Sequence, residues 1–244
     1  MSGEPTSLHD TRVQRRAAWR DFGAFVRRPQ LPAQATGIRA AALPVLGRLF
    51  ALDLLLMALL IVIALGAAAA GIEIPAHVLD DMAIGAPLVL FMLLGAPIGE
   101  ELLFRSWLSG KSGHVAAFLL GFAILLAATA AFFLGQRLPA AFIAGLGAVL
   151  AAYILWRRRG RPPLRFFARY FRWFYLGSTL AFASMHLTNF SEGAALILLP
   201  LTLPQFLLGL ILGYVRVTFG MWANVLFHAA HNSVFVGLIL LGAS

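Results

Sequence analysis

The sequence lacks cysteine altogether and contains few charged residues. Without cysteine, the chain has no disulfide bond, no thiolate metal ligand and no cysteine nucleophile. Charged residues make up 12% of the chain against 61% hydrophobic residues, and the mean hydropathy is +0.86. This composition excludes a soluble domain of 244 residues. The sequence therefore predicts an all-α fold, a polytopic bundle of transmembrane helices.

Lysine is also nearly absent, since Lys111 is the single lysine and the other basic residues are arginines. The net charge of +9 is concentrated in residues 12–48 and 157–172. Arginine clusters next to apolar spans are typical of cytoplasmic segments that face anionic lipid. We therefore expect these segments to bind anionic lipid, and we do not expect nucleic acid as a partner.

Seven apolar stretches are long enough to cross a bilayer, which takes about 20 helical residues. An alternative with eight spans, in which the sixth stretch is split at Pro200 and Pro204, stays open. If the amino terminus is cytoplasmic, the arginine-rich loops also fall on the cytoplasmic side, and only Arg137 does not. We expect an integral membrane protein, and the high alanine and arginine content favours a bacterial inner membrane. The seven stretches are residues 49–70, 82–108, 114–134, 138–156, 173–190, 194–215 and 219–241.

Residues 1–48 are expected to form a cytoplasmic basic arm in front of a transmembrane domain at residues 49–244. Because the first apolar stretch begins near Leu49, no cleaved signal peptide is expected. Apolar and arginine residues alternate in the arm at roughly helical spacing, which is typical of an amphipathic helix lying on a membrane surface. A disordered basic tail is the alternative. The residues in this pattern are Val13, Trp19, Phe22, Phe25 and Val26, with Arg12, Arg15, Arg16, Arg20, Arg27 and Arg28.

Three charged residues, Glu100, Glu101 and Arg105, interrupt the second apolar stretch. Each ionised side chain at the centre of a bilayer costs roughly 2.5–3.5 kcal/mol on insertion scales, so such residues usually serve a function. At about 100° per residue, Glu101 and Arg105 lie on one face of a helix and can form an ion pair. Glu100 points about 100° away from Glu101. We expect one carboxylate to be paired and the other to be free.

Two later stretches carry histidine: one contains His186, and the last contains His228, His231 and Asn232. Taken alone, a buried histidine or asparagine is most often a packing or hydrogen-bonding residue. On the expected topology, however, Glu100, His186 and His228 lie at a similar depth, on the order of 12–14 Å from one surface. The i,i+4 spacing also puts His228 and Asn232 on one helix face. The three stretches thus offer a carboxylate and two imidazoles at one level.

These polar residues fall into ordered motifs on separate apolar segments. Glu-Glu-x-x-x-Arg occupies residues 100–105, Phe-x-x-x-His occupies 182–186, and His-x-x-x-Asn occupies 228–232. In this order the motifs resemble the CPBP family, the CAAX-protease and bacteriocin-processing intramembrane endopeptidases. A weaker element, Phe-x-x-Gly-x-x-x-Gly at 206–213, is similar to the glycine-bearing motif that the family carries between its two histidine motifs.

The resemblance implies that residues 49–244 are a CPBP-like protease domain. Its substrate would be a membrane-embedded or lipidated protein or peptide. Glu100, with His186 opposite, would activate the attacking water. His228 and Asn232 would donate to the oxyanion of the tetrahedral intermediate.

The polar residues near these four are expected to have structural roles. Glu101 and Arg105 are expected to support the helix that carries the catalytic glutamate. His231 is either a further donor or ligand or a helix-packing residue, and we favour packing. We expect Asp53 to be interfacial, and the glycines of residues 206–213 to permit close helix packing.

A zinc-dependent hydrolysis would use the same residues, because Glu100, His186 and His228 form a His₂Glu set with an open position. We favour the version without a cofactor, since Asn232 suits an oxyanion donor and the only carboxylate near in sequence, Glu101, is paired with arginine. A secondary transporter is disfavoured because the two halves lack corresponding broken segments. The intact polar motifs disfavour a non-catalytic immunity or scaffold protein.

Overall fold

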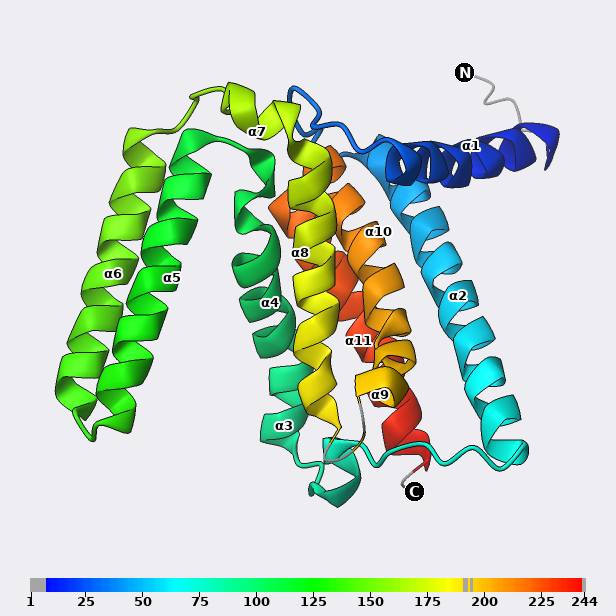
Figure 1. Cartoon of the computed structure of the whole chain (residues 1–244). Coiled ribbons are helices and arrows are strands. Elements are labelled where there is room, and N and C mark those ends of the chain that lie inside the picture. The colour runs from blue at the N-terminus through cyan, green and yellow to red at the C-terminus, as the bar shows by residue number, and fades with distance from the viewer. Residues whose placement is uncertain (1–7, 191–192, 194, 243–244) are drawn as a thin grey trace.

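The computed structural model describes residues 8–190, 193 and 195–242, and these ranges form helices and two isolated β-bridges with no strand. The expected all-α fold is confirmed for this part of the chain. Five helices pack into one bundle, with α10 at its centre (Figure 1). They are α2 (Leu43–Ala69), α4 (Ala96–Arg105), α8 (Phe171–Met185), α10 (Leu203–Phe219) and α11 (Met221–Gly242).

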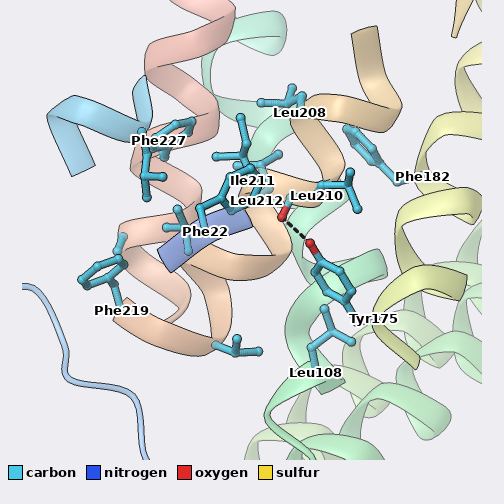
Figure 2. Close-up of a cluster of buried hydrophobic side chains, with 14 of the residues drawn as sticks. Phe22, Leu108, Tyr175, Phe182, Leu208, Leu210, Ile211, Leu212, Phe219 and Phe227 are labelled. Atoms are coloured by element: carbon cyan, nitrogen blue, oxygen red, sulfur yellow. Dashed lines mark hydrogen bonds between the residues drawn. The ribbon is translucent and has the colours of Figure 1, made fainter. Parts of the chain in front are cut away.

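The core of the bundle is built around the second half of α10, as Figure 2 shows. Ile211 is fully buried there, and the Tyr175 hydroxyl of α8 donates to the Leu210 carbonyl at 2.8 Å. A Cβ atom on Gly213 would lie 2.6 Å from the Tyr175 ring, and one on Gly209 would lie 3.0 Å from a side-chain atom of α8. The two glycines therefore permit the close approach of α8 and α10, as expected from their spacing.

The second predicted span is one continuous helical segment whose hydrogen-bond type changes along its length. Its parts are α3 (Ala86–Leu90), the π-helix η3 (Phe91–Gly95), α4 and the 3₁₀-helix η4 (Ser106–Ser109).

The sequence explains the π turn, which frees one backbone carbonyl. The Ala96 N–H donates to the Phe91 carbonyl, and Pro97 has no N–H to offer. Neither Ala96 nor Pro97 therefore donates a backbone hydrogen bond to the Met92 carbonyl. This carbonyl is left for a side chain from another helix.

Helices α5 (Ser112–Phe133) and α6 (Arg137–Arg157) form an antiparallel hairpin that stands beside the bundle (Figure 1). The two helices pack mainly on each other, and a Cβ atom on Gly147 would lie 2.4 Å from Ile124. The hairpin meets the bundle chiefly through η4. It is thus attached to the bundle near one end.

Helix α1 (Leu8–Arg27) lies across one end of the bundle, the same end that carries residues 157–172 (Figure 1). We call this the Arg-rich end. The Trp19 indole donates to a backbone carbonyl at the start of α2 at 2.8 Å, and the Phe25 ring lies 5.0 Å from the Tyr214 ring. Apolar side chains of α1 therefore pack on protein. The side chains of the predicted pattern from Arg12 to Arg16 lie outside the described residues.

Among the residues that the structure describes, five helical segments are long and apolar enough to cross a membrane, and they fall on five of the seven predicted spans. The predicted spans 173–190 and 194–215 fall on shorter helices, namely α8 with 15 residues and α10 with 17. The chain does break between α9 (Ala195–Leu201) and α10, but α9 reaches only about 10 Å. It is too short to be an eighth span. The count of seven stays a prediction.

The remaining helices are single turns or little more. They are η1 (Ala40–Ala42), η2 (Val78–Asp81), α7 (Arg165–Arg169) and η5 (His186–Asn189). Two of them, η2 and η5, lie next to an isolated bridge between His77 and Phe190. This bridge joins the segment after α2 to the segment after α8, at the end of the bundle opposite the Arg-rich end (Figure 1).

Candidate active site

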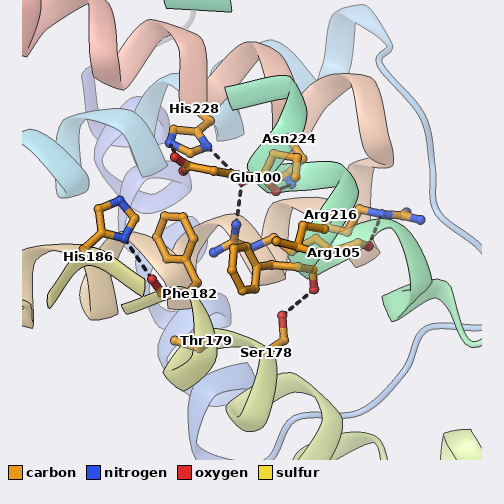
Figure 3. A network of polar contacts seen from close by, with 12 residues as sticks. Glu100, Arg105, Ser178, Thr179, Phe182, His186, Arg216, Asn224 and His228 are labelled. Carbon is orange, nitrogen blue, oxygen red and sulfur yellow. Dashed lines mark hydrogen bonds and ion pairs between the residues drawn. The ribbon is translucent and has the colours of Figure 1, made fainter. Parts of the chain in front are cut away.

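A buried polar network joins α4 to α11 (Figure 3). Glu101, which has no exposed surface, is at its centre. Its carboxylate accepts hydrogen bonds from Arg105 Nη1 at 2.5 Å, from His228 Nδ1 at 2.8 Å and from Asn224 Nδ2. The ion pair expected from the i,i+4 spacing is thus present. Three donors from two helices compensate the burial of one carboxylate, which also joins α4 to α11.

His228 lies between two carboxylates. Because its Nδ1–H donates to Glu101, its other ring nitrogen is fixed in direction, and Nε2 lies 3.6 Å from Oε2 of Glu100. The His228 side chain is 3% exposed and that of Glu100 is 19% exposed. Glu100 is therefore the carboxylate of the pair that can meet a substrate or a water.

His186 ends α8, and its ring orientation is set by its own helix. Its Nδ1 lies 2.8 Å from the carbonyl of Phe182, one turn earlier. Since a carbonyl only accepts, Nδ1 carries the proton and Nε2 is left as an acceptor. The Phe182 ring packs against both imidazoles, 4.7 Å from that of His186 and 5.8 Å from that of His228. The Phe-x-x-x-His spacing thus positions the ring and the imidazole together.

Asn232 is held by the carbonyl that the π turn frees. Its Nδ2 donates to the Met92 carbonyl at 2.8 Å. An amide NH₂ has two hydrogens, so this bond fixes the side chain and leaves a second N–H. The π-helix of the Glu100 segment and the last helix are thereby locked together.

Arg105 and the end of α4 are also anchored by neighbouring helices. The fully buried guanidinium stacks on the Phe182 ring at 4.1 Å. Arg216 Nε donates to the Arg105 carbonyl at 2.9 Å, and Ser178 Oγ donates to the Phe104 carbonyl at 2.6 Å. Helices α8 and α10 therefore position the helix that carries the two glutamates (Figure 3).

A second carboxylate–imidazole pair joins α2 to α11. Asp53 Oδ2 lies 2.7 Å from Nδ1 of His231, and Asp53 is fully buried. The interpretation of Asp53 as interfacial is wrong, because its side chain has no exposed surface and pairs with His231 inside the bundle. His231 connects two helices, and its ring also faces the cavity described next.

All four predicted catalytic side chains line a single cavity of about 540 Å³. Glu100 comes from α4, His186 follows α8, and His228 and Asn232 come from α11. We call this space the Glu100 cavity. Its apolar walls come mainly from α2 and α11, which leaves the polar groups gathered in a largely apolar surrounding. The structure thus unites residues that lie up to 132 positions apart in the chain.

The same residues do not form a metal-ligand set. Within the described ranges, no three His, Cys, Asp or Glu side chains are placed to hold a metal ion together. Of the two imidazoles, only that of His228 lies next to Glu100, with its Nε2 at 3.6 Å from the carboxylate. The three side chains predicted for zinc therefore do not fit one ion in this arrangement.

Residues 162–234 match the family model described as type II CAAX prenyl endopeptidase Rce1-like. This segment is therefore similar to that family. It contains His186, His228 and Asn232, whereas Glu100 precedes it. The match agrees with the resemblance of the two histidine motifs to the CPBP family, and the matched model describes a prenyl endopeptidase. No curated protein and no solved structure matches the chain.

Two buried polar residues next to the candidate site, Asn224 and Asp53, were not predicted from the sequence. Asn224 precedes His228 by one helical turn, so the pattern Asn-x-x-x-His-x-x-x-Asn was a usable signal for a polar stripe on α11. Asp53 carried a weaker signal, a single carboxylate inside an apolar span. Its partner His231 is 178 positions away, and no local pattern predicts that pairing.

Proposed function

We propose that this protein is an intramembrane endopeptidase in which Glu100 activates water to hydrolyse a peptide bond. One observation carries the proposal: Glu100, His186, His228 and Asn232 line the same cavity although they come from separate segments. The Rce1-like match to residues 162–234 supports the same reaction class. Peptide hydrolysis requires a base and an oxyanion donor, and this cavity offers both among largely apolar walls.

The polar contacts suggest a route for the protons. Glu100 takes a proton from the attacking water, whose second hydrogen is accepted by Nε2 of His186. Since Nδ1–H of His228 is engaged by Glu101, His228 can donate only after Nε2 receives a proton, and Glu100 is 3.6 Å away to supply it. His228 then protonates the leaving nitrogen as the C–N bond breaks, a role different from the oxyanion donor expected from the sequence, and the free N–H of Asn232 binds the oxyanion.

The apolar helices and the Arg-rich end also support a substrate class and a membrane location. We propose a membrane-embedded or lipidated protein or peptide as substrate, because the cavity lies among apolar helices. The Arg-rich end would face the cytoplasm and contact anionic lipid, with the bacterial inner membrane as the location.

Comparison of membrane peptidomes tests the proposal and names the substrate. Cells that carry wild-type protein would be compared with cells that carry Glu100→Gln. The matched control is Glu73→Gln, which removes an exposed carboxylate outside the cavity. Product peptides should disappear with Glu100→Gln and persist with Glu73→Gln. Identical peptidomes for wild type and Glu100→Gln, at equal protein levels, would refute the proposed activity.

A further inference from the structure

A second groove lies on the other side of α4, between this helix and the α5–α6 hairpin. It has a volume of about 570 Å³ and shares no lining residue with the Glu100 cavity. We call it the α4–α5 groove. From α4 and η4 it is lined by Gly99, Leu102, Leu103 and Ser106, which recur at helical spacing on one face. Glu101 points away from that face, toward the bundle.

The groove is apolar along most of its length and polar at one end. Its apolar walls include Phe118, Phe122 and Leu125 of α5. Its polar side chains are Ser106, His114 and Arg216, all close to the Arg-rich end, where α4 ends and α5 begins. A long apolar wall with a few convergent polar groups is the profile of a site for an amphiphilic ligand.

The polar end of the groove is positively charged. Arg216 is 5% exposed, and Lys111 and Arg216 both act electrostatically on the His114 imidazole. Arg158 also packs beside this end, since a Cβ atom on Gly113 would lie 3.0 Å from its Cβ. None of the lining residues is acidic. The charge of this end is therefore complementary to an anionic group.

The length of the groove matches one leaflet of a bilayer. Its lining residues on α5 run from His114 to Leu125, a helical length of about 16 Å. This is about half of the roughly 30 Å hydrocarbon core. A ligand with its charged group at His114 would thus lie in the leaflet on the Arg-rich side.

We propose that the α4–α5 groove binds one anionic phospholipid from that leaflet. Its phosphate lies at His114 and Arg216, and an acyl chain follows Phe118 and Phe122 toward Leu125. The acyl chain also contacts Gly99 and Leu102, which flank the two glutamates in sequence, so the lipid supports α4 where the hairpin does not reach it. The proposal is independent of proteolysis.

Native mass spectrometry of the purified full-length protein tests this site. The protein would be incubated with phosphatidylglycerol or phosphatidylcholine of identical acyl chains. We expect one phosphatidylglycerol to stay bound and phosphatidylcholine to be retained at least about tenfold less. Ala117→Trp should fill the groove and lower phosphatidylglycerol retention by a similar factor. The matched control, Leu119→Trp, adds the same side chain on the exposed face of α5 and should leave retention unchanged.

Two further measurements separate the phospholipid from other ligands. His114→Gln should reduce the preference for phosphatidylglycerol without lowering phosphatidylcholine binding. If sn-glycerol 3-phosphate alone displaces the lipid, the groove end is a phosphate site and the proposal is wrong. Displacement by farnesylcysteine would instead assign the groove to a prenylated substrate. Equal retention of both lipids, or equal loss in Ala117→Trp and Leu119→Trp, would also overturn it.

Discussion

At the scale of single residues, the two adjacent glutamates have opposite surroundings. Glu101 accepts from three donors and has no exposed surface, whereas Glu100 faces the cavity with His228 as its neighbour. A buried carboxylate is tolerated when its charge is paired and its oxygens are hydrogen-bonded. Glu101 therefore suits support, and Glu100 suits chemistry.

Removal of Glu101 should cost more stability than removal of Glu100. Glu101→Ala leaves the fully buried Arg105 without its ion-pair partner, and breaking such a pair typically costs about 3–5 kcal/mol. The double change Glu101→Ala/Arg105→Ala should recover part of this loss. Thermal unfolding in detergent would measure both variants. Equal stability of the single and double variants would contradict the pairing.

Asn232 should affect turnover more than folding. As an oxyanion donor, its replacement by alanine should lower the turnover rate by roughly 10²–10³. Loss of the bond to the Met92 carbonyl should cost only about 1 kcal/mol. Turnover and melting temperature would be measured on the same preparation. A variant that unfolds readily but retains its rate per folded molecule would assign Asn232 to structure alone.

Residue contacts could be predicted from the sequence only where they are local. The Glu101–Arg105 pair follows from i,i+4 spacing. The ordered motifs predicted that His186, His228 and Asn232 belong to the site. The sequence could not reveal that His228 donates to Glu101, because 127 positions separate them. The sequence also suggested that no carboxylate is free to orient a zinc-bound histidine. In the structure, Glu101 accepts from His228 and so orients it, although it is paired with Arg105 as well.

At the scale of helices, close contacts decide how the site is assembled. Helix α8 reaches α10 only because Gly209 and Gly213 leave room, and this contact brings Phe182 over Arg105. Of the seven spans predicted from hydropathy, five fall on described helical segments long enough to cross a membrane. Hydropathy could not predict that α8 and α10 are shorter than a full span, because these helices are continued by 3₁₀ turns or interrupted near proline.

A methyl group on Gly213 should destabilise the protein. Gly213→Ala would place its Cβ 2.6 Å from the buried Tyr175 ring, and overpacking of this kind typically costs about 1–3 kcal/mol. The matched control is Gly177→Ala on α8, which meets no atom within 4 Å. The control should be neutral or more stable, because alanine favours a helix over glycine. Equal melting temperatures for both variants would contradict the packing argument.

At the scale of the whole molecule, charge and chemistry are separated along the helices. The Arg-rich end carries α1 and residues 157–172 (Figure 1), while the Glu100 cavity extends from Glu100 and His228 toward the opposite end, where His77 and Asn189 line it. This asymmetry matches a protein anchored on one side of a membrane with its reaction site below that surface. Among the described residues, no metal-ligand cluster accompanies the site.

Chelation distinguishes metal-free hydrolysis from zinc-dependent hydrolysis. If Glu100 activates water without a metal, activity should survive exhaustive chelation, and the purified protein should contain no stoichiometric zinc. If Glu100, His186 and His228 bind zinc, chelation should abolish activity and added zinc should restore it. Metal analysis of wild type and of each alanine variant would accompany the assay. Zinc bound at one mole per protein, lost and regained together with activity, would overturn the metal-free account.

The turnover of Glu100→Gln tests the central claim most directly. Wild type, Glu100→Gln and Glu73→Gln would be purified, reconstituted into vesicles and assayed on a peptide that contains the bond identified from the membrane peptidome. Glutamine preserves shape but cannot accept the proton of water. The account predicts a loss of roughly 10²–10⁴ in rate for Glu100→Gln, with an unchanged melting temperature and normal turnover for Glu73→Gln. Near-normal cleavage by Glu100→Gln would contradict it.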